Sequence, residues 1–106
     1  TACRSWPKGV VDDDLRAPLR GGPPMLLLSG ELDPITPPRD AEALADDLDH
    51  ATHLVVPGQG HGVAGVGCVP RLIADFLEDP LAPLAAACVQ RAGPFPFAVD
   101  ANGPKP

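Results

Sequence analysis

Two short apolar runs separated by an amphipathic stretch constrain the fold of this chain more than any other feature. Residues 25–29 read MLLLS and residues 52–56 read THLVV. A continuous apolar run is typical of a strand covered on both faces, as in a parallel sheet flanked by helices. Two parallel strands need a crossover connection, and the residues between the runs supply one. The pattern therefore predicts an α/β fold built on a strand-helix-strand unit.

The stretch between the two runs carries the signals of a helix. Thr36 suits the N-cap, and Pro37 suits the first helical position. Apolar residues then recur at i, i+3, i+4 and i+7, namely Ala41, Leu44, Ala45 and Leu48. Acidic residues lie largely on the opposite side, so we expect one buried face and one solvated face.

A second amphipathic helix follows the second run. Its apolar positions are Val69, Leu72, Ile73, Phe76 and Leu77, and it is expected to stop at the 78–80 sequence Glu-Asp-Pro. The alanine-rich residues 81–89 predict a short helix after Pro83. We divide the chain into an irregular connector from a missing N-terminal part (1–24), an α/β unit (25–79) and a Pro-rich tail (80–106). Because so few elements cannot cover both faces of a sheet, we expect an incomplete portion of a larger domain.

Composition excludes several classes of function. A formal net charge of −6 argues against a nucleic-acid or anionic-membrane surface, since both require clustered Lys and Arg. No run approaches the roughly 18 apolar residues of a membrane span. The sequence contains 3 cysteines, which would be plain thiols in the cytosol but would leave one partner outside the chain in an oxidising compartment.

Two residues with catalytic chemistry follow the two runs. Asp33 comes after the first run, and His61 lies between two glycines after the second. Loops at the carboxyl ends of parallel strands converge, so we expect these side chains to meet. In a Ser-His-Asp triad the carboxylate holds one imidazole nitrogen while the other nitrogen takes the proton of the nucleophile. Spacing alone also fits a turn carboxylate before proline and a surface-loop histidine.

Three other polar residues have simpler interpretations. Glu31 could contact substrate, but a solvated loop acid is the simpler interpretation. His50 and His53 are three residues apart, yet they straddle a helix-to-strand junction, and no Cys or acid at ligand spacing supports a metal site. We therefore expect both histidines on the surface and predict neither a metal nor a cofactor.

Two motifs resemble the acid and histidine loops of α/β-hydrolases. Residues 28–38 read LSGELDPITPP and residues 56–62 read VPGQGHG. They are similar to the loops of secreted tripeptidyl- and prolyl-aminopeptidase-like (TAP-like) enzymes, because Gly-x-x-Asp-Pro-x-Thr-Pro-Pro and Gly-x-Gly-His-Gly occur in the right order and at the right separation. The resemblance extends to residues 3–7, to Gly67-Cys68 and to Cys88, and so covers most of the chain.

The resemblance implies specific roles and cysteine pairings. It implies that Asp33 is the triad acid and His61 the general base. It also implies a disulfide between Cys68 and Cys88, and a bond from Cys3 to a cysteine upstream of this sequence. The nucleophile elbow, oxyanion-hole loop and lid of α/β-hydrolases precede the acid and histidine in chain order, and none occurs here. We therefore expect the nucleophilic serine outside this sequence.

Three hypotheses about function follow. The first is the C-terminal part of a secreted or periplasmic serine hydrolase that cleaves amide bonds near peptide N-termini, with esters as the next candidate substrate; the chain alone would be inactive. The second is a non-catalytic interaction module that docks on a separate N-terminal chain or self-associates through an exposed strand edge. The third is an α/β binding domain in which Asp33 and His61 are incidental.

Overall fold

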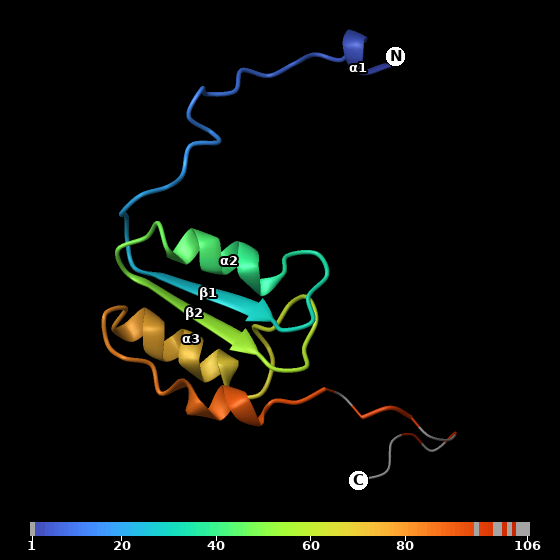
Figure 1. Cartoon of the computed structure of the whole chain (residues 1–106), viewed down its shortest axis with the longest axis vertical. Coiled ribbons are helices and arrows are strands. Elements are labelled where there is room, and N and C mark those ends of the chain that lie inside the picture. Colours follow the sequence, from blue (N-terminus) through green and yellow to red (C-terminus); the bar gives the residue numbers. More distant parts are fainter. Residues whose placement is uncertain (1, 95, 99–100, 102, 104–106) are drawn as a thin grey trace.

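A computed structural model describes residues 2–94, 96–98, 101 and 103, and its centre is a two-stranded parallel sheet. Strand β1 (Met25–Gly30) pairs with β2 (Ala51–Val56), in a register that runs from Met25 opposite Ala51 to Gly30 opposite Val56 (Figure 1). Both strands therefore end at the same edge of the sheet. The predicted α/β class and the parallel strand-helix-strand order are confirmed.

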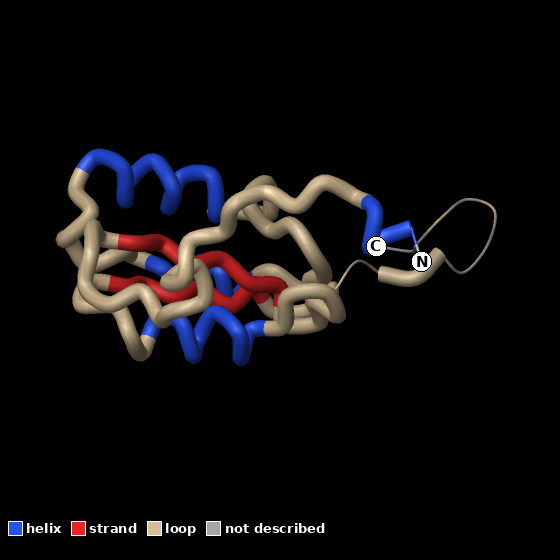
Figure 2. Tube along the Cα trace, turned by 90° about the horizontal axis from the view of Figure 1, so that it is seen from above, coloured by secondary structure: helices blue, strands red, loops and turns tan. Residues whose placement is uncertain are grey.

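One helix lies on each face of this sheet, but the cover is incomplete, because residues 25–28 of β1 stay half-buried. Helix α2 (Pro38–Ala45) lies on one side of the strands and α3 (Val69–Glu78) on the other (Figure 2). The 3₁₀ helix η1 (Ala86–Arg91) packs beside β2. The core lies on the α3 side and consists of Leu54, Val56, Val63, Val69, Leu72 and Val89. The second predicted helix thus has the expected bounds. The short helix predicted within residues 81–89 forms as the 3₁₀ helix η1, which begins at Ala86 and runs past the expected end to Arg91.

The first helix differs from its prediction at both ends. It begins at Pro38, with Pro37 in the N-cap position and no side-chain cap hydrogen bond. Thr36 is not the cap, because Asp33 engages its amide and its hydroxyl. At the other end the chain tightens into i→i+3 turns, so Leu48 is buried beyond the helix.

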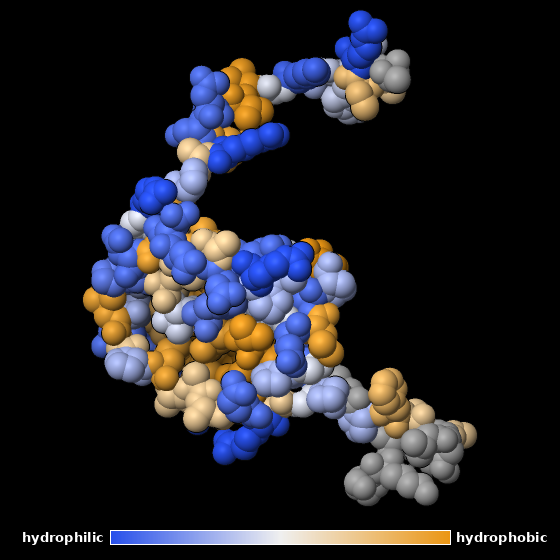
Figure 3. All heavy atoms as spheres, in the orientation of Figure 1, coloured by the Kyte–Doolittle hydropathy of each residue, from blue (hydrophilic) through white to orange (hydrophobic). Residues whose placement is uncertain are grey.

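The N-terminal connector extends away from the α/β unit. Helix α1 (Ala2–Ser5) is a single turn, and an irregular, exposed segment follows it (Figure 1). Trp6, whose position before Pro7 predicts a packing anchor, is 76% exposed. Other apolar side chains of this arm are also exposed, as the space-filling view shows (Figure 3); they are Val10, Val11, Leu15 and Leu19. The apolar side chains of the connector therefore do not form a core of their own.

The C-terminal tail is only partly described. Positions 95, 99, 100, 102 and 104–106 lie outside the described residues, so beyond Pro94 the structure describes the tail only at 96–98, 101 and 103. In the described part of the chain, no helix has the length and apolar character needed to cross a membrane.

Candidate active site

The acid and histidine loops are joined by backbone hydrogen bonds at the carboxyl edge of the sheet. The amide of Glu31 donates to Val56 O over 3.0 Å, and the amide of Leu32 donates to Gln59 O over 2.8 Å. Gly30 lies where a Cβ atom would come within 2.1 Å of the carbonyl oxygen of Gly60. Only glycine allows so close an approach of the two backbones. Glycine at position 30 therefore allows the backbones of the acid and histidine loops to come into contact.

His61 and Asp33 meet directly. Nδ1 of His61 lies 2.9 Å from Oδ2 of Asp33. The Asp33 side chain is 3% exposed, whereas the His61 side chain is 57% exposed. Within the described residues, Nε2 of His61 makes no hydrogen bond. A buried carboxylate thus holds one nitrogen of an exposed imidazole, and the other nitrogen has no hydrogen bond within the described residues.

Hydrogen bonds keep the Asp33 carboxylate ionised. Oδ1 accepts from the amides of Ile35 at 2.8 Å and Thr36 at 3.1 Å, and Oδ2 accepts from the Thr36 hydroxyl at 2.8 Å. Burial acts to raise the pKa of Asp33, but the bonds from Ile35, His61 and Thr36 together outweigh it and hold the pKa well below its ordinary value. Asp33 is therefore both a turn carboxylate and the partner of His61.

Thr36 is a member of this site that the sequence interpretation missed. Its Oγ1 lies 3.3 Å from Nδ1 of His61 while it donates to Asp33 Oδ2. The available signal was the spacing Asp-Pro-x-Thr, in which a carboxylate can bond the amides two and three residues on and leave the hydroxyl beside its second oxygen.

Glu31 braces the histidine loop. Its Oε2 accepts a hydrogen bond from the amide of Gly58 over 2.7 Å. Gly58 has φ of +65°, a conformation that favours glycine. Glu31 is exposed but bonded across the two loops, so it is more than the solvated acid that we expected.

The remaining histidines lie apart from the pair. His50 is exposed, as predicted. His53 was also expected on the surface, but it lies half-buried in β2, with Nε2 2.9 Å from the hydroxyl of buried Ser29. The period of the strand turns it toward the α2 face of the sheet, which a three-residue spacing could not reveal. Across the described residues, no cluster of three or more His, Cys, Asp or Glu residues could hold a metal ion.

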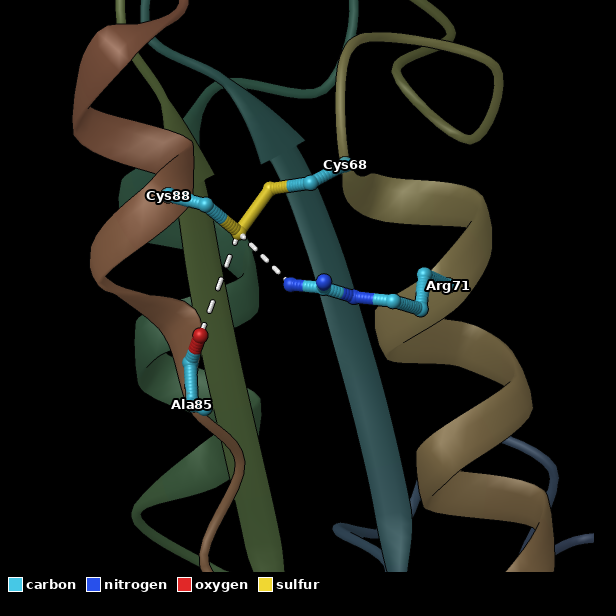
Figure 4. The surroundings of a disulfide bond; sticks show 4 residues. All are labelled: Cys68, Arg71, Ala85 and Cys88. Atoms are coloured by element: carbon cyan, nitrogen blue, oxygen red, sulfur yellow. Dashed lines mark hydrogen bonds between the residues drawn. A yellow bond between two sulfur atoms is a disulfide. The ribbon is translucent and has the colours of Figure 1, made fainter.

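A disulfide connects Cys68, at the start of α3, to Cys88 in η1 (Figure 4). This is the pairing that the resemblance implied. The guanidinium of Arg71 lies 3.8 Å from the Cys88 sulfur, and the carbonyl of Ala85 lies at the same distance. Cys3 is exposed and has no partner within the described residues, so its bond to an upstream cysteine stays a prediction.

Comparison with known proteins identifies one related family. The family model described as TAP-like protein matches residues 1–88. No curated protein matches the chain. No solved structure matches it either.

Proposed function

Because the chain belongs to the TAP-like family of α/β-hydrolases, we propose that it supplies the acid and the base of a serine hydrolase. Asp33 is the triad acid and His61 the general base. The observation that carries this proposal is the 2.9 Å contact between Nδ1 of His61 and Oδ2 of the buried Asp33. The nucleophilic serine is contributed from outside this sequence, since no nucleophile elbow occurs in it.

The geometry of the pair suits proton transfer. With Asp33 accepting from Nδ1–H, the neutral imidazole presents a lone pair on Nε2. Nε2 takes the proton of the serine as its oxygen attacks the carbonyl carbon, and the carboxylate stabilises the imidazolium that forms. The imidazolium then gives the proton to the leaving amine or alcohol. A water molecule, deprotonated by Nε2, then attacks the acyl carbon of the acyl-enzyme. The imidazolium returns the proton to the serine oxygen as the acid product leaves.

For the substrate, we propose amide bonds near the N-termini of peptides, with esters as the second class. Support comes from the Gly-x-x-Asp-Pro-x-Thr-Pro-Pro and Gly-x-Gly-His-Gly motifs, which resemble those of aminopeptidase-like enzymes. We also propose a secreted or periplasmic location. The Cys68–Cys88 disulfide supports an oxidising compartment, because structural disulfides persist there and are rare in the cytosol.

The test is replacement of His61 in the complete hydrolase. His61→Ala should lower kcat/KM by several orders of magnitude, since a triad acts as a unit. His50→Ala is the matched control, because His50 is exposed and lies outside the acid and histidine loops. The 106-residue chain alone should not turn over an active ester. Full activity of His61→Ala would refute the proposed role.

A second function is favoured by the sheet itself. The described sheet contains 2 strands, so each strand has one edge without a backbone partner in it. Unpaired edges are templates for association with another strand. We propose that an open strand edge of this sheet docks on the N-terminal part of the same hydrolase, or on a second copy of the chain. Sedimentation of the isolated chain tests this, because a monodisperse monomer would argue against any need for a partner.

A further inference from the structure

Gln59 connects three segments at the back of the histidine loop. The residue is buried, at 7% exposed. Its Nε2 donates to the carbonyl oxygen of Gly93 over 2.6 Å. Its own carbonyl accepts from the amide of Leu32, next to the acid. One residue therefore ties the histidine loop to the acid loop and to the C-terminal segment.

The C-terminal segment also packs directly on the turn before Gln59. A Cβ atom on Gly58 would lie 2.5 Å from two atoms of Pro94. Glycine is required here by the contact as well as by the positive φ of this residue. The 92–94 segment thus lies against the histidine loop at two adjacent positions.

This segment is itself held in place by the fold. Val89 of η1 is 3% exposed and belongs to the core, and Ala92 packs against the same cluster. The disulfide of Cys88 bonds η1 to Cys68, the N-cap residue of α3. The carbonyl of Gly93 is therefore a fixed acceptor, because the chain is anchored in the core and by the disulfide within the preceding five residues.

The tip of the histidine loop has few side-chain contacts, although the Gly60 carbonyl lies against Gly30. A Cβ atom on Gly60 or Gly62 would meet nothing within 4 Å, so nothing packs where side chains of the two residues beside His61 would lie. The buried residues on either side of the tip are Gln59 and Val63, the latter 4% exposed. The direct restraints on the His61 side chain are its contacts with Asp33 and Thr36. Placement of the imidazole therefore depends on where Gln59 and Val63 hold the two ends of the loop tip.

We propose that Gln59 is a positioning residue for His61, and that it acts by tying the histidine loop to the C-terminal segment at Gly93. This inference rests on the proposed function, in which His61 is the general base. Without the bond from Gln59 to Gly93, the histidine loop loses its tie to the C-terminal segment, and the imidazole samples positions away from Asp33. Loss of alignment lowers the rate of the chemical step more than it lowers substrate binding.

The test is the Gln59→Met variant of the complete hydrolase, which keeps the length of the side chain and removes its N–H donor. Gln90→Met is the matched control, because Gln90 is exposed on η1 and makes no side-chain hydrogen bond among the described residues. Pro94→Ala is a second variant that keeps the Gly93 carbonyl and loosens the contact with Gly58. Active sites are counted by complete titration with a fluorophosphonate, so that unfolded protein does not enter kcat.

We expect Gln59→Met to lower kcat per active site by roughly 10- to 100-fold with KM changed less than about threefold. Pro94→Ala should shift kcat in the same direction by less, and Gln90→Met should leave it unchanged. A purely structural role would instead lower the unfolding midpoint while kcat per active site stayed at the wild-type value, and that result would overturn the proposal.

Nitrogen-15 NMR of the His61 ring separates this inference from the proposed function. At a pH where the ring is neutral, the wild-type protein should show the Nδ1–H tautomer, and Gln59→Met should show a mixture. A wild-type tautomer in Gln59→Met would overturn the positioning role even if His61 is catalytic. An unchanged kcat in His61→Ala would instead show that the proposed function has failed.

Discussion

Nδ1 of the exposed His61 ring lies 2.9 Å from Oδ2 of the buried Asp33 carboxylate, although the two residues are 28 apart in the chain. Parallel pairing of β1 and β2 brings both loops to one edge of the sheet. Gly30 then allows their backbones to touch. The contact therefore follows from the order of the elements and from one residue without a side chain.

Gly30→Ala should separate the two loops. Its new Cβ would lie 2.1 Å from Gly60 O and 2.5 Å from Gln59 O, both of which are backbone atoms that cannot rotate away. We expect a lower unfolding midpoint. We also expect kcat to fall more than the fraction of unfolded protein alone would explain. Thermal unfolding and kinetics of the complete hydrolase measure the two effects. Gly65→Ala is the control, since a Cβ there meets nothing within 4 Å; equal behaviour of both variants would contradict this explanation.

Thr36→Val should weaken the hold on Asp33. Valine has the shape of threonine but cannot donate to Oδ2, a bond of 2.8 Å in the structure. We expect the pKa of Asp33 to rise toward its ordinary value, and kcat to fall roughly tenfold, the size of one net hydrogen bond. Carbon-13 NMR of the carboxyl group follows the titration. Thr36→Ser retains the hydroxyl and should behave like the wild type; a Thr36→Val titration that matches the wild type would contradict the role of this bond.

Stability should depend on pH through Asp33. Its pKa in the folded state is depressed, whereas the unfolded chain titrates near the usual aspartate value of about 3.9. The unfolded state therefore binds the proton first as the pH falls. The stabilisation from this carboxylate is complete above the unfolded value, declines below it, and is lost once the folded group protonates.

Urea unfolding at several acidic pH values checks this prediction. Between pH 6 and the lowest pH at which the protein stays folded, the free energy of unfolding should fall less steeply in Asp33→Asn than in the wild type. Asp40→Asn serves as a control, because Asp40 is exposed on α2. Parallel pH profiles for the wild type and Asp33→Asn would contradict the depressed pKa.

Removal of the disulfide should destabilise the α3 and η1 region. The bond closes a loop between residues 20 apart, and the chain-entropy model gives about 3 kcal/mol for such a loop. We expect the Cys68→Ala/Cys88→Ala variant to lose free energy of unfolding on that scale. Denaturant unfolding without reductant measures it. Cys3→Ser, at an exposed position, should show no comparable loss in the same 106-residue chain.

Most of the fold could be predicted because its signals are local. The apolar runs and the 69–78 periodicity determine the strands and α3, and the shared direction of the strands places Asp33 beside His61. The interactions that were missed depend on tertiary contacts. Thr36 suits a helix cap by sequence, but the carboxylate three residues earlier competes for its hydroxyl.

Two other residues illustrate the same limit. The sequence can place His53 in a strand, but its partner, the hydroxyl of Ser29, lies on the neighbouring strand. Gln59 gives no signal in the sequence, because its partner, the carbonyl of Gly93, is 34 residues away and is a backbone atom. A single sequence does not specify which backbone groups meet at such distances.

The most direct measurement of the role of the pair is kcat/KM of Asp33→Asn in the complete hydrolase. The amide keeps the shape of the side chain but can present an N–H to Nδ1, which favours the wrong tautomer of His61. A triad acid predicts a fall of about 10⁴-fold, with Asp40→Asn unchanged. Activity of Asp33→Asn within a few-fold of the wild type would contradict the assignment of Asp33 and His61 as acid and base.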